Sequence, residues 1–272
     1  MSPVDDAASR ARLLAAYDDQ LRTHAETDGA SRVERLGPLW LATYDGRGGF
    51  VTYRDLGGAD AATIGDLVAA ALAHFRADPA IATVEWKTRG HDRTPGLHEA
   101  LVAHGFVRGE RESVVVGEAR ALAVDVELPE GVTLRRITAG PDAGRDVRAM
   151  LTMQAEVFGD ADPDRRVPGL MRRLARADGL ELWVAEADGR VVGAGRLEPV
   201  EDSDFAGIWG GATLAAWRGR GIYRALTAAR ARSALALGKT LVHSDSTEYS
   251  RPILERAGLL TVSTTTPYEW HR

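Results

Sequence analysis

A turn rich in arginine and glycine is the part of this chain best suited to chemistry: residues 217–224 read WRGRGIYR. An apolar, strand-like segment precedes the turn, and an alanine-rich helical pattern follows it. The first N–H groups of a helix have no partner within the helix and point outward. Gly219 and Gly221 lack the Cβ atoms that hold a ligand off the backbone, and Arg218 and Arg220 carry donors that suit phosphate. The spacing predicts a pyrophosphate site.

Three known phosphate loops differ in the residues that they require. A P-loop needs a lysine directly after its second glycine, and no lysine follows Gly221. A dinucleotide-binding loop needs a third glycine where this chain has Arg224. The stretch from Arg218 to Tyr223 fits the pattern Arg/Gln-x-x-Gly-x-Gly/Ala at every position but the last, and it resembles the acyl-CoA loop of the GNAT acetyltransferase superfamily.

The elements expected around this loop follow the order of the GNAT fold. Asp188-Gly189 is a strong hairpin signal, and Gly238 ends the helix that begins at the loop. The expected strands are 132–137, 180–187, 190–197, 205–214, 240–246 and 261–270, and the expected helices are 146–158, 168–177, 222–237 and 252–257. This β-α-α-β-β-β-α-β-α-β series is similar to the GNAT fold over residues 131–270. It predicts an α/β fold of the mixed α+β kind, with a mixed central sheet flanked by helices.

The resemblance also implies a cofactor and a reaction. In the family, the strand before the loop splays from its neighbour and pairs its backbone with the pantetheine arm, and here Ala212, Thr213 and Leu214 would supply those groups. The implied pyrophosphate contacts are Arg218, Gly219, Arg220, Gly221, Ile222, Tyr223 and Arg224. The implied reaction is direct transfer of an acetyl group from acetyl-CoA, without a metal, to a primary amine of a small molecule or a protein. Much of the rate of such a reaction comes from positioning.

The chain departs from the family pattern at the catalytic positions. Many members have a tyrosine as general acid in the last helix, where this chain has Leu254. Some members have a catalytic glutamate on the strand before the loop, but residues 205–211 contain no carboxylate. Tyr223 replaces a small residue of the loop, and its phenol either reaches the cofactor or packs over the helix start. The resemblance therefore assigns neither the acid nor the base.

The residues themselves offer candidates for the base. Asp245 lies on the strand beyond the helix, two residues after His243, and Glu198 follows the second strand of the hairpin. We expect Asp245 first and Glu198 second to accept the proton of the amine, while His243 fits a packed or surface histidine as well as a functional one. The alternative is a non-catalytic acyl-CoA-binding or regulatory module, because both usual catalytic residues are missing.

The first half of the chain resembles a degenerate copy of the second. Its expected helix at 64–75, strand at 82–87, helix at 96–103 and strand at 112–116 repeat the later order, although a generic α/β domain also fits. Residues 55–63 contain two aspartates and no arginine, so this copy should repel phosphate. We expect tandem GNAT-like domains at 1–118, with a leading helix at 5–20, and at 131–272, joined by a linker at 119–130, with one CoA in the second.

Composition narrows the remaining function classes. The 272 residues carry a net charge of −5, which argues against a nucleic-acid partner. The absence of cysteine excludes disulfides and thiolate chemistry. The first residues do not form a signal peptide, and no apolar run is long enough to cross a membrane. We expect a cytoplasmic protein without a membrane partner, as a monomer or homodimer.

Overall fold

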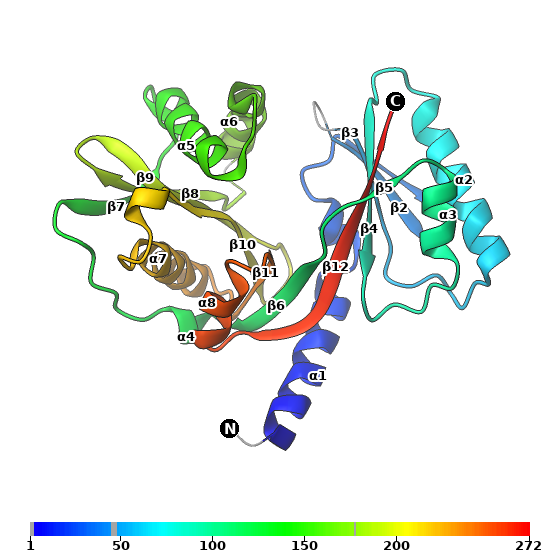
Figure 1. The fold of residues 1–272 in the computed structure, drawn as a ribbon, viewed down its shortest axis with the longest axis horizontal. Helices are drawn as coiled ribbons and strands as arrows, with labels where there is room; N and C mark the ends of the chain where they lie inside the picture. Colours follow the sequence, from blue (N-terminus) through cyan, green and yellow to red (C-terminus); the bar gives the residue numbers. More distant parts are fainter. Residues whose placement is uncertain (1–2, 45–47, 177) are drawn as a thin grey trace. The chain divides into compact units, whose positions relative to one another are not determined.

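The computed structural model describes residues 3–44, 48–176 and 178–272. Within it the chain divides into two compact units. Unit 1 comprises Met1–Val114, Asp245–Glu248 and Thr261–Arg272, and unit 2 comprises Val115–Ser244 and Tyr249–Leu260. Each unit is a sheet with helices packed against it, which is the mixed α/β architecture that the sequence predicts (Figure 1).

The sheet of unit 1 has the strand order β1-β2-β3-β4-β12, and each neighbouring pair is antiparallel except β3 and β4. Its strands are β1 (Arg32–Leu36), β2 (Leu39–Tyr44), β3 (Gly48–Thr52), β4 (Thr83–Arg89) and β12 (Leu260–His271), with β5 (Val107–Arg108) paired to β12. Its helices are α1 (Pro3–Gln20), η1 (His24–Thr27), α2 (Ala61–Arg76) and α3 (Leu97–Ala103). Apolar side chains of α2 and α3 pack with Val84 and Trp86 of β4, and each such side chain contributes about 1.5–3 kcal/mol on burial.

The sheet of unit 2 has the order β11-β10-β9-β8-β7, and only β10 and β11 are parallel. Its strands are β7 (Val132–Ile137), β8 (Glu181–Ala187), β9 (Arg190–Pro199), β10 (Phe205–Thr213) and β11 (Leu241–Ser246), whose last two residues belong to unit 1. Strand β6 (Glu112–Glu118) begins in unit 1 and ends in unit 2. Its helices are α4 (Ala119–Leu122), α5 (Ala143–Phe158), η2 (Pro163–Arg166), α6 (Val167–Arg176), η3 (Ala215–Trp217), α7 (Ile222–Ala236) and α8 (Arg251–Arg256). In Figure 1, α5 and α6 cover one side of these strands, and α7 and α8 cover the other.

Local signals in the sequence account for several elements of unit 2. Asp188 and Gly189 both have positive φ, 50° and 74°, as a two-residue hairpin turn of type I′ requires, and they join β8 to β9 as predicted. Gly238 follows α7 with φ 78°, which ends that helix where the sequence analysis expects it. The helix expected at 168–177 forms as α6, and its expected last residue, Ala177, lies outside the described residues.

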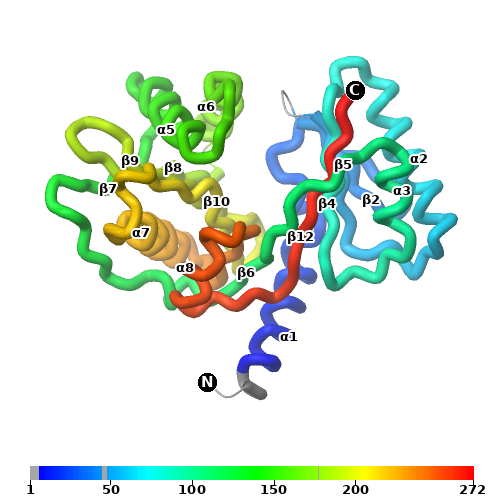
Figure 2. Tube along the Cα trace, viewed as in Figure 1, coloured from blue at the N-terminus to red at the C-terminus, as the bar shows by residue number. Residues whose placement is uncertain are grey.

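The division into units differs from the boundaries expected from the sequence. From Thr261 onward, β12 belongs to unit 1 rather than to the unit that contains β7 to β10. The reason is strand pairing: residues 265–271 pair with residues 89–83 of β4, so that the red end of the chain lies beside cyan β4 in Figure 2. The expected linker at 119–130 begins with the short helix α4. None of the described helices combines the length and apolarity that a membrane-spanning helix needs.

Candidate functional site

The turn between β10 and α7 has an open helix start. Gly219 and Gly221 have φ of 75° and 84°, a left-handed conformation that favours glycine. Gly221 is the N-cap of α7 and offers no side chain to the first N–H groups of that helix. Arg218, Arg220 and Arg224 are exposed around this helix start. The turn therefore combines unfilled backbone donors with positive charge, as a phosphate site requires.

Two contacts hold the arginines of this turn in place. The Nε of Arg218 donates to the carbonyl of Thr213 at the end of β10, at 3.1 Å. The guanidinium of Arg220 lies 5.0 Å from the ring centroid of Trp217, which is cation–π distance. The loop is thus tied to the strand before it by Arg218, and Arg220 is held against the ring of Trp217.

Strand β10 separates from β11 before it reaches the turn. The two strands pair only from Phe205 with Leu241 to Gly207 with His243, although β10 continues to Thr213. Within the described residues, the later part of β10 therefore has strand partners on its β9 edge alone. Its other edge presents backbone N–H and C=O groups that an extended ligand can pair with. This is the splay that the GNAT resemblance implies.

A bulge interrupts β10 within the splayed part. The register with β9 shifts between Trp209 and Ala212, and Gly210 has φ 59°. The buried side chain of Gln154, from α5, donates to the carbonyl of Gly210 at 2.7 Å and holds the bulge. The sequence analysis does not identify Gln154, and the glycine pair Gly210-Gly211 in a strand is the signal that points to the bulge.

The three strand residues expected to contact pantetheine lie next to this bulge. Ala212 and Thr213 pair with β9, and Leu214 donates its N–H to Val192 at 2.9 Å. The hydroxyl of Thr213 is buried and has no hydrogen-bond partner among the described residues. The structure thus brings Ala212, Thr213 and Leu214 together with the turn at residues 218–224, on one continuous path of backbone.

The linker passes close to the start of α7, which the sequence analysis does not anticipate. A Cβ atom placed on Gly221 would lie 3.4 Å from the carbonyl oxygen of Glu127 and 3.7 Å from Val126 Cγ1. Farther along α7, Arg232 donates to the carbonyl of Val124 at 2.9 Å. Gly221 is therefore constrained both by its φ and by the chain beside it.

Tyr223 packs toward the β10 bulge. A Cβ atom on Gly211 would lie 2.7 Å from Cε2 of Tyr223, so the ring occupies the space beside this glycine. Burial raises the pKa of Tyr223 above its ordinary value, against the lowering effect of Arg230 and of hydrogen bonds with Ser250 and Thr227. Leu254, which stands where many family members have the acid, is 1% exposed and belongs to the core.

Glu198 is held by two arginines of unit 2. Its Oε1 accepts from Nε of Arg196, and its Oε2 accepts from Nη1 of Arg173 at 3.0 Å. Burial alone would raise the pKa of Glu198, but the charges of Arg196 and Arg173 hold it below its ordinary value. Glu198 therefore stays ionised and has a low affinity for a proton.

Asp245 belongs to unit 1, and its partner there is a lysine. Its Oδ2 lies 2.5 Å from Nζ of Lys87, and both side chains are largely buried. Burial opposes the charge of Lys87, but Asp245 raises the pKa of the ammonium above its ordinary value. His243 belongs to unit 2, where its ring contacts Phe205 and Trp209 edge to face at 5.8 and 5.1 Å. His243 thus has an aromatic environment, unlike Asp245.

In unit 1 the helix start corresponding to that of α7 is closed. Asp60 caps α2, and its Oδ1 accepts the N–H of Thr63 at 2.9 Å. The hydrogen bond from Thr63 lowers the pKa of this carboxyl. A carboxylate of the chain therefore occupies the position that an anionic ligand would take.

The region where β3 and β4 part is also filled. The two strands pair only from Gly49 with Val84 to Val51 with Trp86. Beyond this point, Thr52 donates its hydroxyl to Glu26, and Glu26 also accepts from Arg89. Unit 1 thus places its own charged side chains at the end of β3.

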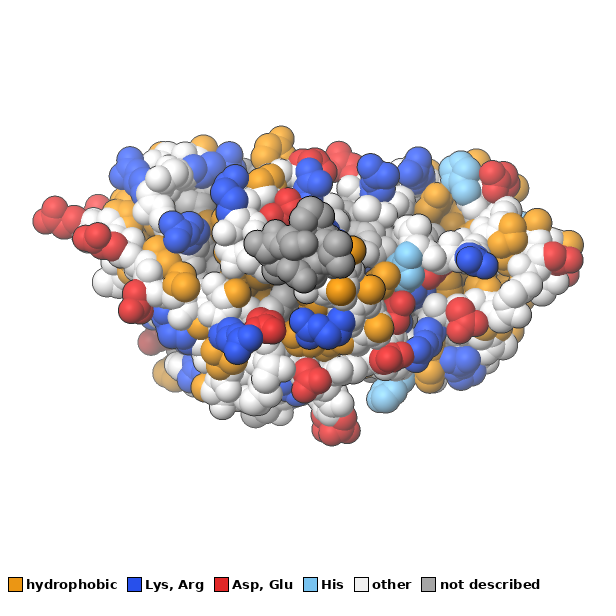
Figure 3. All heavy atoms as spheres, turned by 90° about the horizontal axis from the view of Figure 1, so that it is seen from below, with side chains coloured by type: hydrophobic (Ala, Val, Ile, Leu, Met, Phe, Trp, Pro, Cys, Tyr) orange, Lys and Arg blue, Asp and Glu red, His pale blue; other side chains and the backbone are white. Residues whose placement is uncertain are grey.

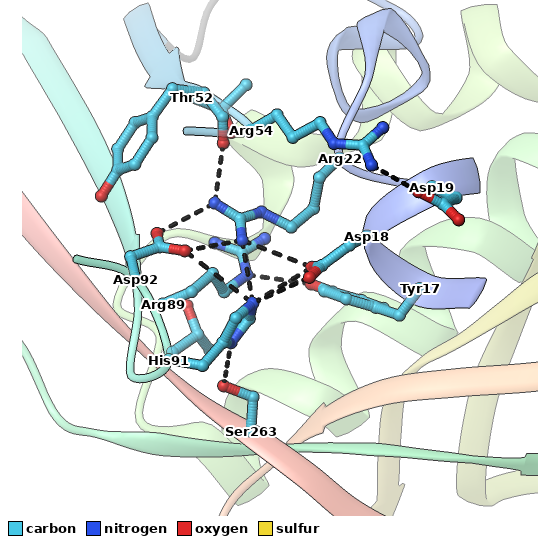
Figure 4. A network of polar contacts seen from close by, with 12 residues as sticks. Tyr17, Asp18, Asp19, Arg22, Thr52, Arg54, Arg89, His91, Asp92 and Ser263 are labelled. Carbon is cyan, nitrogen blue, oxygen red and sulfur yellow. Dashed lines mark hydrogen bonds and ion pairs between the residues drawn. The ribbon is translucent and has the colours of Figure 1, made fainter. Parts of the chain in front are cut away.

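A network of ion pairs surrounds this filled region (Figure 4). Arg22 bridges Asp92, with nitrogen–oxygen distances of 2.7 and 2.9 Å, and donates to the carbonyl of Tyr53 at 3.0 Å. His91 lies between Asp18, at 3.1 Å, and the hydroxyl of Ser263, at 2.6 Å. The network connects α1 to β12 within unit 1.

Charges on the surface are mixed. On the face that Figure 3 shows, Lys and Arg side chains are interspersed with Asp and Glu side chains rather than separated by sign. Among the residues that the structure describes, no group of His, Cys, Asp and Glu is arranged to hold a metal ion.

Comparisons with known proteins identify the fold. Residues 147–259 match the model of the Acetyltransferase (GNAT) family. A GCN5-related N-acetyltransferase from Kribbella flavida has a TM-score of 0.66 at 19% identity, over 96% of this chain and 95% of its own. A conserved protein of unknown function from Staphylococcus epidermidis ATCC 12228 has a TM-score of 0.69 at 13% identity, over 92% of this chain and 98% of its own.

A tandem GNAT protein from the clavulanic acid biosynthesis pathway has a TM-score of 0.60 at 15% identity, over 96% of this chain and 95% of its own. Among the curated proteins, none matches the sequence. The predicted resemblance is confirmed: residues 147–259 carry a GNAT domain, and the fold of the chain is that of GNAT proteins, a tandem one included.

Proposed function

We propose that unit 2 binds acetyl-CoA and transfers its acetyl group to a primary amine of a small molecule or a protein. The observation that carries this proposal is the course of β10, which parts from β11 after Gly207 and leads into the uncapped start of α7. One continuous segment thereby offers free strand backbone, a glycine turn and positive charge. These are the groups that an extended thioester with a pyrophosphate requires.

In this proposal two parts of the segment bind two parts of the cofactor. The pyrophosphate lies against the N–H groups of residues 219–224, with Arg218, Arg220 and Arg224 supplying charge. The pantetheine arm lies along residues 212–214, on the edge of β10 that has no strand partner in the part of the chain that is described. The N–H of Leu214 is already donated to Val192, so the arm pairs with other backbone groups of this segment. The acetyl group then lies beside the glycine bulge.

Direct transfer proceeds by attack of the neutral amine on the thioester carbon. The bond between nitrogen and carbon forms, the carbon–sulfur bond breaks, and the thiolate leaves with the electron pair. The nitrogen gives up one proton, and the thiolate takes up one from solvent. Because alkyl amines are mostly protonated at neutral pH, some group must first accept a proton from the ammonium.

For that proton we propose Asp245 and Glu198, in this order, as the carboxylates to test. Their ion pairs with Lys87 and with Arg196 and Arg173 impose a condition, since a paired carboxylate accepts a proton only when its partner moves away. A general base predicts that Asp245→Asn or Glu198→Gln lowers kcat/KM by ~10²–10⁴ at neutral pH, with recovery at high pH. Full activity in both variants would assign deprotonation to solvent.

A non-catalytic acyl-CoA-binding module is the second candidate. The buried Leu254 in place of the family's usual tyrosine favours it, as does the lack of a carboxylate on β10. Such a module would bind acetyl-CoA without consuming it, whichever amine is added.

The deciding experiment combines calorimetry with a thiol-release assay. The full-length protein is titrated with acetyl-CoA, then incubated with acetyl-CoA and a panel of primary amines, and free thiol is measured. Binding followed by amine-dependent thiol release supports the transferase. Binding without thiol release for any amine supports the module, and absence of binding refutes both. Arg145→Ala, an exposed substitution on α5, serves as the control.

A further inference from the structure

Three arginines of unit 2 meet around one carboxylate on the α6 side of the sheet. Glu198 of β9 accepts from Arg196 of the same strand and from Arg173 of α6. Arg166, the last residue of η2, lies close enough to Arg196 to be repelled by it. We call Arg166, Arg173, Arg196 and Glu198 the arginine cluster. None of the four has a role in binding CoA in the function proposed above.

The cluster borders the part of β10 where the acetyl group is proposed to lie. Arg196 is the cross-strand partner of Trp209, the last β10 residue in register before the bulge. A Cβ atom placed on Gly210 would be 3.5 Å from Nη1 of Arg196. The guanidinium of Arg196 is therefore beside the bulge rather than at a distant edge of the sheet.

One carboxylate of the cluster serves two of its guanidinium groups, because Glu198 pairs with both Arg173 and Arg196. Arg166 lies 3.7 Å from Asp160. Burial lowers the pKa of Arg166, and the charge of Arg196 lowers it further. A bound anion would relieve this repulsion.

The cluster remains accessible although it is mostly buried. The side chains of Arg173, Arg196 and Arg166 are 19%, 24% and 35% exposed. Desolvated guanidinium groups that are still reachable bind carboxylates and phosphates more tightly than fully solvated ones, and their planar forks fit such groups bidentately. Glu198 holds Arg196 and Arg173 in place, because its Oε1 accepts a hydrogen bond from Arg196 and its Oε2 accepts one from Arg173.

We propose that the amine acceptor carries an anionic group, a carboxylate or a phosphate, which Arg196 and Arg166 bind. This inference replaces the role of base that Glu198 was given above as the second carboxylate to test: Glu198 is a positioning residue, which orients the guanidinium groups of Arg196 and Arg173. This inference rests on the proposed acetyl transfer, because it names the class of acceptor for that reaction. The amine end of such a substrate would face β10, and its anionic end would face η2 and α6.

The test uses matched pairs of amines that differ in the anionic group alone. β-Alanine is compared with propylamine, and 2-aminoethyl phosphate with ethanolamine, both by thiol release with acetyl-CoA and by ligand-observed NMR binding. We expect kcat/KM of the wild type to be roughly 10- to 100-fold higher for the anionic member of at least one pair than for its neutral member. The pair that shows the larger preference distinguishes a carboxylate from a phosphate.

Variants assign that preference to the cluster. In Arg196→Met and Arg166→Met, the ratio of kcat/KM for the anionic amine to kcat/KM for the neutral amine should fall toward one, mainly because KM for the anionic amine rises. The affinity for acetyl-CoA, measured by calorimetry, should stay as in the wild type. Glu198→Gln should raise KM for the anionic amine without a new pH dependence of kcat, whereas a base would change the pH profile. Arg145→Ala should keep the preference of the wild type.

Two results would overturn the inference. One is a wild type that binds and acetylates neutral amines as well as their anionic partners. The other is a preference that survives both Arg→Met substitutions. Failure of the proposed function would look different, because acetyl-CoA would then not bind or no thiol would be released. The NMR comparison of the paired amines still decides the inference in that case.

Discussion

The two units differ most clearly at the helix that connects the two strands of their parallel pair, α2 between β3 and β4 and α7 between β10 and β11. Before α7, Gly221 in a left-handed conformation leaves the first N–H groups without a side-chain cap. Before α2, the carboxylate of Asp60 accepts the N–H of Thr63. A helix start favours an anion in either case. Unit 1 supplies the anion from its own chain, and unit 2 leaves the place open.

The strands before these helices differ in the same way. In unit 2, β10 runs free of β11 toward a glycine bulge. In unit 1, the hydroxyl of Thr52 at the end of β3 donates to Glu26, which Arg89 neutralises, and Arg22 donates to the carbonyl of Tyr53. The comparison teaches that this fold keeps or loses a ligand site according to which polar groups satisfy its backbone. The arrangement of helices and strands alone does not decide it.

The largest effect should come from closing the open helix start. Gly221→Val places a β-branched side chain at φ 84°, with its Cβ 3.4 Å from the carbonyl oxygen of Glu127. We expect no measurable binding of acetyl-CoA by calorimetry. The control is Gly58→Val in unit 1, at φ 74° with no atom within 4 Å of the added Cβ. Equal affinity in the two variants would contradict the asymmetry of the units.

A second test breaks the polar filling of unit 1. Asp245→Asn removes the carboxylate that is paired with the buried ammonium of Lys87, and should lower the free energy of unfolding by about 3–5 kcal/mol. Chemical denaturation measures this loss. The double variant Lys87→Met with Asp245→Asn removes both charges and should recover most of it.

The same pair of variants separates structure from catalysis. If Asp245 only pairs with Lys87, the double variant should recover activity together with stability. If Asp245 accepts the proton of the amine, the double variant should be stable and still inactive. An Asp245→Asn protein as stable as the wild type would show that the ion pair contributes nothing.

Removal of one loop charge should have an intermediate effect. Arg218→Ala deletes a guanidinium that is exposed beside the open helix start and bonded to the carbonyl of Thr213. We expect acetyl-CoA affinity to fall by about 1.5–3 kcal/mol, roughly 10- to 150-fold in Kd. Calorimetry beside Arg145→Ala as control measures this, and an unchanged Kd would remove Arg218 from the site.

The smallest expected effect concerns the pH dependence of stability. The pKa of Glu198 lies below its ordinary value of 4.5 in the folded protein. As the pH falls, the unfolded chain therefore takes up a proton at Glu198 at a higher pH than the folded protein does. The stabilisation is fully present above pH 4.5 and is lost as the pH falls through the folded pKa. The difference in unfolding free energy between the wild type and Glu198→Gln should therefore shrink on acidification. A difference that stays constant between pH 6 and pH 3 would argue against the paired carboxylate.

Local signals were enough to predict much of unit 2. The turn Asp188-Gly189, the start of α7 after Gly221 and its end at Gly238 each follow from the conformational needs of a few neighbouring residues. The splay of β10 came from the resemblance rather than from any local pattern. The loop residues remain predictions until a ligand is measured.

Long-range pairing could not be predicted. No local pattern shows that β12 pairs with β4, or that Lys87 meets Asp245, 158 residues away. The strands β1 and β2 are also missing from the predicted elements, although the apolar run of β2 is a usable signal. One feature of the sequence pointed to the arginine cluster: Arg196 and Glu198 are charged residues that follow the small and apolar run 191–195 of β9.

The most direct test of the central claim is the stoichiometry of acetyl-CoA on the full-length wild-type protein. Calorimetric titration should give one molecule per chain, because of the two corresponding helix starts, those of α7 and α2, the start of α7 alone lacks a side-chain cap. A stoichiometry of two would show that unit 1 also binds the cofactor despite Asp60. No binding at all would contradict the assignment of the turn at residues 218–224.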